Sequence, residues 1–482
     1  MVIEMNNNSI WQKDLKNNKY INRGIDEKTD ILIIGGGITG LSTSYFLKDT
    51  NYKITLIDKD KLLNGVTVKS TAKITYLQGI IYQTLAKNFN IDISKKYYKS
   101  QKDSSKLIDK IVKENNISCN YEQVPSVVFT NENKNVEKIY NEKEILKKFS
   151  ASITSFSDEK IKIGIKANDT YCFNPVKYLA GLTSILKNRI NICENVVAKN
   201  IKKVNEEYEV LTSSGIIKSK IVIVACHYPF FVFPLMIPIK TYIKREYVNV
   251  AKVYNSYNIN AINIDNKLYS IRYYNNYLIY TSNSHKLTSK TDYYKNYQKS
   301  KKDFKILVNK DSEYTWMNQD IISNDNLPYI GKIDNNLYIA TAYNAWGMTN
   351  GTIASKIISD LIINNKSEYE SLFNPKRCNI NLITSSFLGS FSYLKAYAKS
   401  IFIKHNPYYI KIKNIMYGVY KDENNKIHYI KLICPHMKCS LVFNKEENTW
   451  DCPCHGSRFD IDGKLLVGPA INDLISSGEL ND

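Results

Sequence analysis

The pattern of hydrophobic and polar residues near the start of the chain predicts a strand, a tight turn and a helix. An apolar run begins after Thr29, glycines occupy most of residues 35–40, and an apolar helical segment follows. A second apolar run at 53–58 comes at the distance that a crossover helix requires, and the handedness of this connection places it parallel to the first. A doubly wound α/β sheet is therefore expected to begin here.

The middle of the chain alternates between helical and strand-like patterns. Residues 91–150 are Lys-rich with helical spacing, Asn174 and Pro175 begin another helix, and residues 215–225 form an apolar strand. Residues 240–320 contain short alternating segments, which are typical of antiparallel strands in a separate sheet. An apolar strand at 337–342 and a helix at 353–363 then return the chain to the first domain, which is therefore discontinuous.

One uncharged apolar segment, 221–239, is long enough to span a bilayer. Pro229, Pro234 and Pro238 interrupt it, and each removes a backbone donor that a continuous helix would need. We therefore expect a buried strand at 221–225 followed by a Pro-rich crossing, rather than a membrane span.

A second apolar stripe follows one helical face of residues 387–404, with Lys395, Lys399 and Lys404 between its members. This pattern predicts a connecting helix that packs its stripe against a neighbouring domain. A basic amphipathic helix lying on a membrane surface is the alternative.

The chain of 482 residues has 66 Lys and Arg against 46 Asp and Glu, a formal charge of +20. Such an excess could attract nucleic acid, anionic lipid or an acidic substrate. The basic residues are dispersed with no run of five, so we attribute the charge to the general residue usage of the chain and expect no nucleic-acid binding. Residues 1–19 have no apolar core and do not resemble a signal peptide, so we expect a soluble, cytoplasmic protein without a transmembrane segment.

The glycine turn has the spacing that binds a dinucleotide. Gly35, Gly37 and Gly40 stand between the predicted strand and helix, and Asp58 ends the next strand 18 residues after Gly40. The first glycine permits the turn, the second lets backbone N–H groups approach a pyrophosphate, and the third allows the helix to pack closely on the strand. Asp58 would accept hydrogen bonds from ribose hydroxyls.

Four of the nine cysteines and two of the six histidines fall within residues 434–455. They include the pattern C-x-H, then fifteen residues, then C-x-x-H. This clustering predicts a metal centre, for which an iron-sulfur cluster and a zinc site are the two alternatives. The other five cysteines are scattered, which is typical of small buried side chains.

From residue 29 to about 377 the chain resembles the D-amino-acid-oxidase and glycine-oxidase superfamily of FAD-dependent oxidoreductases. The motifs that carry the resemblance are the glycine fingerprint continued through Ser42, residues 65–73, Asn174–Pro175, 222–225, 327–331 and 345–351. In this superfamily the last of these turns lies at a helix N-terminus beside the pyrimidine end of the flavin ring. Backbone N–H groups and the helix dipole there would stabilise negative charge on a reduced flavin.

This resemblance also implies which residues contact FAD. They are Gly35, Gly37, Ile38, Thr39, Gly40, Asp58, Lys59, Thr67, Ser70, Thr71, Ala72, Lys73, Gly331, Gly347, Met348 and Thr349. A cation at Lys73 would favour the reduced anion of the flavin, although a solvated surface lysine is the alternative. Lys73 and His227 are the candidates for a catalytic role.

Residues 406–482 resemble a Rieske [2Fe-2S] domain. In that family Cys434 and Cys452 would bind one iron, and His436 and His455 would bind the other. Replacing two thiolates by neutral imidazoles raises the potential of such clusters to roughly −150 to +300 mV. The run of residues around Cys452 is not a zinc-ribbon pattern, which favours the iron-sulfur alternative.

The Rieske resemblance implies three further features. Cys439 and Cys454 align with the pair that forms a disulfide between the two ligand loops of respiratory Rieske proteins. Ser457 would donate a hydrogen bond to a cluster sulfide, whereas Phe459 stands where high-potential relatives carry a tyrosine, so we expect a potential below theirs. Lys438 replaces a glycine that often precedes the second cysteine.

We therefore expect an α/β plus α+β fold, with a doubly wound FAD-binding domain and an antiparallel-sheet substrate domain, followed by a small all-β Rieske domain. The expected segments are 1–90, 151–228 and 323–377 for the FAD-binding domain, 91–150 and 229–322 for the substrate or cap domain, 378–405 for a connecting helix, and 406–482 for the Rieske domain.

The two cofactors together indicate a converter between two-electron and one-electron chemistry. We expect oxidation of a C–N bond in an amine or amino acid at FAD, with electrons leaving singly through the Rieske [2Fe-2S] cluster to an unidentified acceptor. Arg245, Arg272 or tyrosines of the antiparallel sheet could hold a substrate carboxylate. The alternative is an electron-transfer module that acts on a protein partner and has no small-molecule substrate.

Overall fold

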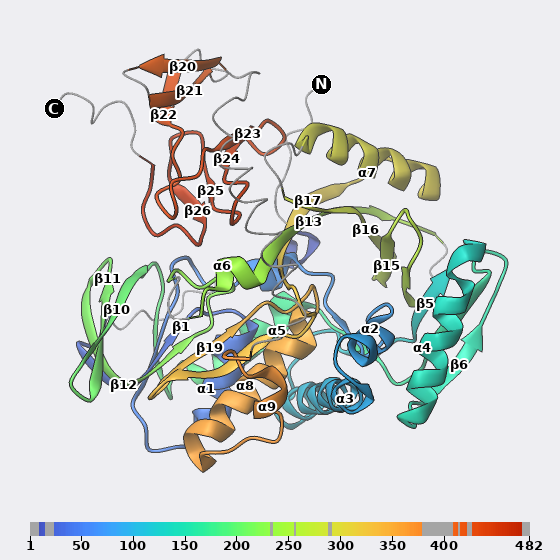
Figure 1. Ribbon diagram of the computed structural model, residues 1–482, viewed down its shortest axis with the longest axis horizontal. Coiled ribbons are helices and arrows are strands. Elements are labelled where there is room, and N and C mark those ends of the chain that lie inside the picture. The colour runs from blue at the N-terminus through green and yellow to red at the C-terminus, as the bar shows by residue number, and fades with distance from the viewer. Residues whose placement is uncertain are drawn as a thin grey trace.

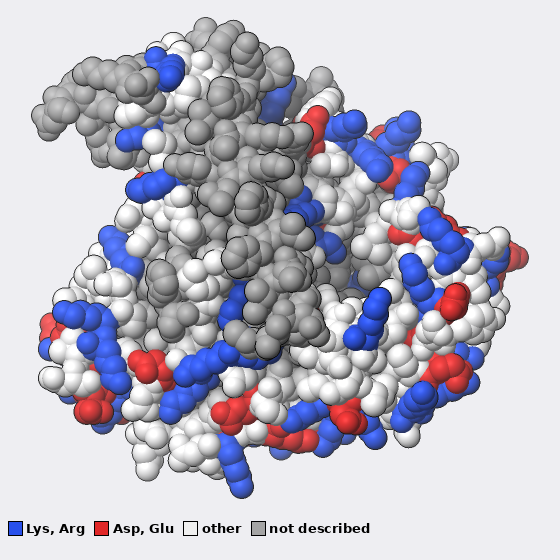
Figure 2. Space-filling view, in the orientation of Figure 1, with Lys and Arg blue, Asp and Glu red and all other residues white. Residues whose placement is uncertain are grey.

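The structure is a computed structural model that describes residues 9–14, 24–231, 235–254, 257–287, 292–377, 408–412, 415–421 and 427–474. Two large sheets carry helices on their faces, and the C-terminal strands lie above α6 and the β13–β17 edge of the second sheet (Figure 1). The visible face carries Lys and Arg side chains mixed with Asp and Glu (Figure 2).

The first sheet contains the predicted doubly wound unit, because β1 pairs in parallel with β2 on one side and with β12 on the other. The other edge of β12 pairs with β11 along its first half and with β19 along its second half. The strands are β1 (Lys28–Ile34), β2 (Ile54–Ile57), β9 (Asn191–Cys193), β10 (Ala198–Val204), β11 (Glu207–Thr212), β12 (Gly215–Val224), β18 (Tyr329–Asp334) and β19 (Leu337–Thr341). The chain thus returns to this sheet at β19, as predicted.

Helices α1 (Ile38–Leu47), α5 (Pro175–Leu186) and α8 (Gly347–Asn364) pack beside this sheet, with α1 in contact with both of the others. The sequence specifies the start of α5. The side chain of Asn174 accepts hydrogen bonds from the N–H groups of Val176 and Lys177, and Pro175 occupies the first helical position, where no N–H is needed.

The second sheet has the strand order β17-β13-β16-β15-β14-β5-β7-β6, and its neighbours are antiparallel except for the parallel pair of β14 and β5. Helix α7 (Tyr293–Val308) packs on β13 and β16. The strands are β5 (Ser126–Thr130), β6 (Ile153–Phe156), β7 (Ile163–Ala167), β13 (Thr241–Lys252), β14 (Asn260–Asn263), β15 (Tyr269–Tyr274), β16 (Tyr277–Lys286) and β17 (Tyr314–Ser323).

The strand pairing corrects the domain boundary expected at residue 151. Both β6 and β7 pair within the second sheet, so this part of the chain belongs with the substrate sheet and not with the FAD-binding sheet. The apolar pattern marked these strands only weakly, because β6 is mostly exposed at the edge of the sheet.

The Lys-rich segment 91–150 forms two helices, as its spacing predicts, but strands β4 and β5 separate them. The remaining elements before the C-terminal region are short or connect the two sheets. They are η1 (Ile10–Asp14), η2 (Val66–Lys69), β3 (Lys73–Ile74), α2 (Ile81–Asn88), α3 (Ile91–Glu114), β4 (Glu122–Gln123), η3 (Asn133–Asn135), α4 (Val136–Lys148), β8 (Tyr171–Cys172), α6 (Ile237–Lys240) and α9 (Glu370–Phe373).

The C-terminal region is all β, in two small antiparallel sheets around a core that contains Trp450 and Phe459. The strands are β20 (Tyr408–Ile412), β21 (Ile415–Lys421), β22 (Ile427–Lys431), β23 (Val442–Asn444), β24 (Thr449–Asp451), β25 (Arg458–Phe459) and β26 (Leu465–Val467). The helix expected within 378–405, including the stripe at 387–404, lies outside the described residues. Among the helices that the structure does describe, none combines the length and the apolar character needed to cross a membrane.

Candidate functional site

The turn between β1 and α1 can be made only by glycines. Gly35 has φ +113°, and a Cβ there would lie 2.6 Å from the carbonyl oxygen of Ala225 at the end of β12. A Cβ on Gly40 would lie 1.8 Å from the carbonyl oxygen of Gly35. The close approach of these backbones brings the N-terminus of α1 over the ends of β1 and β12.

Asp58 ends β2 beside this turn. Its two carboxylate oxygens accept hydrogen bonds from the N–H groups of Gly36, at 2.6 Å, and Asp60, at 2.9 Å. The carboxylate is therefore held at the strand end, where the fingerprint needs it. The ammonium group of the neighbouring Lys59 instead pairs with Asp60 and donates to the carbonyl of Leu466 in the C-terminal region, at 2.8 Å.

The loop that runs from η2 to β3 lies against the same turn. The hydroxyl of Thr67 accepts a hydrogen bond from the N–H group of Ile38 at 3.2 Å, and the hydroxyl of Ser70 accepts one from Ala72 at 3.0 Å. Two indoles fix the outer side of the loop, because Trp11 donates to the carbonyl of Ser70 and Trp316 donates to that of Lys69, both at 2.8 Å.

Arg272 binds the backbone of this loop. It was expected to hold a substrate carboxylate, and the structure corrects that expectation. The side chain is fully buried, and its guanidinium donates to the carbonyl oxygens of Thr71, Ala72 and Phe173. A cation that is surrounded by carbonyls of its own chain fixes the backbone before Lys73. No described carboxylate shares it, and it is not placed to bind a ligand.

The N-terminus of α8 meets that of α1. A Cβ on Gly351 would lie 2.8 Å from the side chain of Ile38, and the hydroxyl of Ser355 donates to the carbonyl of Thr39 at 2.8 Å. Gly347, Met348 and Thr349 form the first turn of α8, and the carbonyl of Thr349 accepts a hydrogen bond from Ser104 at 2.6 Å.

These segments fit FAD. Neither α1 nor α8 is capped by the side chain of the residue that precedes it, although the N–H group of Ile38 donates to Thr67. A buried helix terminus of this kind leaves further donors and a partial positive charge for an anionic group. The structure thus brings together the fingerprint, Asp58, the loop 65–73 and residues 347–349. Gly331, with φ +130°, lies in β18, whose neighbour β19 pairs with β12.

Three charged residues that the sequence analysis missed lie opposite this assembly. Lys244 and Glu246 alternate along β13 with Arg245 and Tyr247, so they lie on the face of the sheet away from α7. The ammonium group of Lys244 lies 3.1 Å from the carboxylate of Glu246. Asp320 stands beside Lys244 on the neighbouring strand β17.

Burial and mutual interaction shift the pKa values of these charged residues. It raises the pKa of Asp320 to about 7, with the charge of Glu246 acting in the same direction. Although burial alone would lower it, the pKa of Lys244 is raised by Glu246. Burial, together with the charge of Arg272, lowers the pKa of Lys73 to about 7, while Glu246 opposes that shift. Lys73 is therefore close enough to interact with the charges of β13, and it can exchange a proton near neutral pH.

His227, the second candidate for a catalytic role, is held by contacts with β17 and β19. It follows β12 with φ +65°, its carbonyl accepts a hydrogen bond from Thr341, and its ring contacts the backbone of Gln319 on β17. Burial lowers its pKa to about 4, so the imidazole is neutral. The next residue, Tyr228, packs its ring against His455 of the C-terminal region at 6.0 Å between centroids.

Arg245, the second residue expected to hold a substrate carboxylate, instead pairs with a carboxylate of the C-terminal region. It is 1% exposed, lies on the face of β13 opposite to Lys244, and forms an ion pair of 2.6 Å with Asp451. No pattern in the sequence indicates this partner, which is 206 residues away.

The predicted metal ligands come together at the tips of two C-terminal loops. The rings of His436 and His455 lie 5.0 Å apart between centroids, and the side chains of Cys434 and Cys452 are hydrogen-bonded to each other. Both nitrogens of His436 are buried without a hydrogen-bond partner among the described residues. Burial also lowers the pKa of His436 to about 4, which gives the neutral imidazole that binds a metal. Two thiols and two imidazoles in this arrangement fit a [2Fe-2S] cluster.

Cys439 and Cys454 form the disulfide that the resemblance implies. These two sulfur atoms are therefore not available to bind iron, whereas Cys434 and Cys452 remain as free thiols. Ser457 is fully buried, and its hydroxyl oxygen accepts a hydrogen bond from the N–H group of Ala470 at 3.0 Å, which leaves its proton for Cys434. Lys438 takes the left-handed conformation, φ +60°, that a glycine would take more easily.

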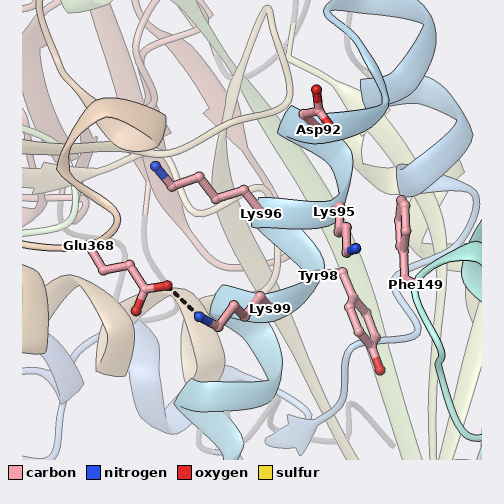
Figure 3. A pocket seen from close by; sticks show the side chains of 7 residues that line it. All are labelled: Asp92, Lys95, Lys96, Tyr98, Lys99, Phe149 and Glu368. Atoms are coloured by element: carbon pink, nitrogen blue, oxygen red, sulfur yellow. Dashed lines mark hydrogen bonds and ion pairs between the residues drawn. The ribbon is translucent and has the colours of Figure 1, made fainter.

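A groove of about 430 Å³ on α3 lies apart from both sites. Figure 3 shows its side chains, with Lys99 paired to Glu368 across the opening and Tyr98 beside Phe149. The groove is open and lined by lysines of an exposed helix face, so it adds nothing to the chemistry of the candidate sites.

Comparison with known proteins agrees with this geometry. Residues 30–361 match the family described as FAD dependent oxidoreductase, and residues 393–477 match the Rieske [2Fe-2S] domain. A Bacillus subtilis (strain 168) protein named as a Rieske 2Fe-2S iron-sulfur protein, YhfW, is 30% identical over 475 residues, which cover 93% of each chain.

Two solved structures share the fold of the first three quarters of the chain. The L-proline dehydrogenase from P. horikoshii matches with a TM-score of 0.63 and 18% identity, over 73% of this chain and 98% of that one. The glycine oxidase from Geobacillus kaustophilus matches with a TM-score of 0.62 and 12% identity, over 73% of this chain and 100% of that one.

Proposed function

The chain belongs to the family of FAD dependent oxidoreductases and carries a Rieske [2Fe-2S] domain, and from this premise we propose that it oxidises a C–N bond of an amine or amino acid and passes the electrons on singly. The single observation that carries the proposal is the presence of both cofactor sites in one chain, in two parts of the molecule that contact each other through Arg245–Asp451 and Tyr228–His455. When bound, FAD supplies a two-electron acceptor and the cluster a one-electron carrier.

The fingerprint and its surroundings would hold FAD. The open N-terminus of α1 is suited to the pyrophosphate, Asp58 to a ribose, and the first turn of α8 to the pyrimidine end of the ring. Cys434, His436, Cys452 and His455 would hold the two irons.

The charged group on β13 and β17 would receive the substrate. An amine must lose its ammonium proton before a C–N bond is oxidised, and a group with a pKa near 7 accepts that proton efficiently at neutral pH. Asp320 and Lys73 both have pKa values of about 7, and the charge of Glu246, which pairs with Lys244, acts on both of them. Arg245 and Arg272 are occupied by other partners, so an amino-acid substrate would be held by Lys244, Lys73 or a tyrosine of the antiparallel sheet.

The two structural relatives named above support a substrate of this class, because one is named a proline dehydrogenase and the other a glycine oxidase. Their identity to this chain is below 20%, so they support the fold and suggest the substrate class.

Stopped-flow reduction of the holoprotein by a panel of amines and amino acids tests the proposal. We expect at least one compound to bleach the flavin first and the cluster afterwards. No reduction by any compound would contradict the proposal and favour an electron-transfer module that serves a protein partner.

A variant sharpens this test. We expect Asp320→Asn to slow flavin reduction at pH 7 by roughly 10²-fold and to flatten its pH dependence, because a positioned base contributes about this much. Asp311→Asn is the matched control, since Asp311 is 80% exposed. Equal rates and pH profiles in the two variants would remove Asp320 from the mechanism.

A further inference from the structure

The Rieske domain is attached to the rest of the protein by a buried ion pair. Arg245 of β13 donates to Asp451 of β24 at 2.6 Å, and the two side chains are 1% and 0% exposed. The ring of Tyr293 lies 4.9 Å from the guanidinium on its other side. Because no water reaches this pair, salt screens it little, and its geometry fixes how the two parts meet.

A second contact reaches the residue next to the proposed iron ligand His455. Arg245 also donates to the side-chain oxygen of Gln319 on β17, at 2.6 Å, and this orients the amide so that its nitrogen donates to the carbonyl of Gly456 at 3.0 Å. Gly456 has φ +78°, and a Cβ there would lie 2.3 Å from the nitrogen of Gln319. A larger residue at this position would therefore adopt a strained backbone and displace the amide of Gln319.

These contacts give the two histidines different surroundings. His455 is 4% exposed and packs on Tyr228, which follows β12 three residues after Ala225, the residue that touches Gly35 of the FAD fingerprint. His436 is half-buried, and the two residues that follow it, Met437 and Lys438, are exposed. The loop of His455 thus packs against the flavoprotein part, and the loop of His436 is the more exposed of the two.

We propose that Arg245 and Gln319 are positioning residues that hold the loop of His455 against Tyr228, so that the cluster accepts electrons from the flavin of the same chain on this side and releases them on the side of His436. The proposal rests on the proposed function. Each transfer moves one electron from reduced flavin to the oxidised cluster, so a flavin that holds two electrons needs two transfers and a one-electron acceptor protein that reoxidises the cluster between them.

Asp451 has partners on both sides of the junction, so the contact with Arg245 can be removed while those inside the Rieske domain remain. Asp451 also accepts hydrogen bonds from Thr449, at 2.8 Å, and from Arg458, at 3.2 Å, within the Rieske domain. Replacing Arg245 removes the ion pair across the junction and the contacts of Arg245 with Gln319 and Tyr293, but it removes no contact within the Rieske domain. The carboxylate of Asp451 keeps a cationic partner, so the domain can retain its fold and its cluster.

The experiment uses the holoprotein and its own flavin photochemistry, with EDTA as the electron donor, so that no substrate is needed. After a light flash, absorbance follows the flavin, and freeze-quench EPR follows the reduced cluster. The variants are Arg245→Met, which keeps the bulk of the side chain, and Arg245→Lys, which keeps only the charge. Arg189→Met is the control, because Arg189 pairs with Asp49 at the surface with 49% of its side chain exposed.

We expect transfer from flavin to cluster to slow at least roughly tenfold in Arg245→Met, to be intermediate in Arg245→Lys, and to match the parent in Arg189→Met. We also expect only the Arg245→Met rate to fall with added sucrose, because a released domain must diffuse back before it accepts an electron. Cofactor content and the EPR spectrum of the cluster should stay unchanged, which separates positioning from misfolding.

Two results overturn different claims. Transfer in Arg245→Met that is as fast as in the parent, and equally independent of viscosity, would overturn the positioning role while leaving the proposed function intact. A parent protein whose flavin is reduced but whose cluster never is would overturn the proposed electron route itself. Should Arg245→Met lose its cluster, Gln319→Leu carries the same expectation in the same assay, because it removes the bonds of Gln319 to Gly456 and to Arg245 but leaves the Arg245–Asp451 ion pair.

Discussion

At the scale of single residues, burial decides which charges this protein can use. Lys73 and Asp320 have pKa values of about 7 because burial disfavours their charged forms, and neighbouring like charges, Arg272 and Glu246, add to the effect. A third enclosed group, Glu142 of α4, lies outside the candidate sites. Its carboxylate accepts hydrogen bonds from the N–H groups of Tyr82 and Gln83 at the start of α2, both at 2.9 Å.

Glu142 makes a prediction about the pH dependence of stability. Burial raises its pKa from 4.5 to about 7, so the folded protein holds the proton more tightly than the unfolded chain. Its contribution to the free energy of unfolding is therefore greatest below pH 4.5 and is lost as the pH rises to about 7. Relative to Glu142→Gln, which cannot ionise, we expect the parent to lose at most about 3 kcal/mol over this range.

Urea unfolding of both proteins across this pH range measures the difference. Glu144→Gln is the control, because Glu144 is an exposed residue of the same helix. A stability difference between parent and Glu142→Gln that does not change with pH would show that Glu142 ionises normally in the folded protein.

At the scale of elements, the βα turn of the FAD fingerprint and the ligand loops of the Rieske region carry the chemistry of the molecule. Each is held by a close contact or bond between two positions of the chain. In the βα turn the third glycine of the fingerprint touches the first, and in the Rieske region a disulfide joins the two ligand loops. Each arrangement can be tested by a change of one or two atoms.

We expect Gly40→Ala to lower the stability by about 1–3 kcal/mol and to release FAD, because its Cβ would lie 1.8 Å from the carbonyl of Gly35. Alanine is the better helix former, so any loss comes from this contact. The ratio of flavin to protein after purification measures the effect. Gly65→Ala is the control, since nothing lies within 4 Å of its added Cβ, and equal flavin content in both variants would refute the expectation.

The disulfide between Cys439 and Cys454 closes a loop of 15 residues and should contribute about 3 kcal/mol to the stability of the Rieske region. We expect the variant with serine at both positions to lose its cluster at a lower temperature than the parent, followed by visible circular dichroism. Cys439→Ser and Cys454→Ser should each behave like the double variant, since each breaks the same bond. Additive effects of the two changes would mean that the bond itself contributes little.

At the scale of the whole molecule, the relative potentials of the two cofactors decide which way electrons move. Hydrogen bonds to the cluster and its ligands raise its potential, and Ser457 is placed to donate one to Cys434. Phe459, in the core of the Rieske region, cannot donate another. The expectation of a potential below that of respiratory Rieske proteins follows, and a redox titration of the holoprotein checks it.

We expect Phe459→Tyr to raise the potential by about 40 mV, the equivalent of one hydrogen bond of about 1 kcal/mol. Phe443→Tyr is the control, because Phe443 packs on Trp450 at the edge of the same core. A potential that moves equally in both variants, or in neither, would mean that residue 459 does not set it.

The sequence by itself determined the two cofactor motifs. Gly35, Gly37 and Gly40 lie within one turn, and each pair of ligands, such as Cys434 and His436, lies within one loop, so chain connectivity alone brings them together. The strand and helix periods likewise located the parallel strands β1, β2, β12 and β19 of the first sheet, and Asn174–Pro175 determined the start of α5. The charges of Lys244 and Glu246 alternate along a strand, and this signal could have marked them as facing one side.

Only the tertiary structure decided which distant residues meet. Arg245 and Asp451 are 206 residues apart, and nothing in the sequence near either one indicates the other. The same holds for Arg272, whose partners are carbonyl oxygens of a loop 200 residues earlier, and for β6 and β7, which join the second sheet. The physical reason is that periodicity specifies which face of an element is buried, whereas packing of the whole chain specifies what covers it.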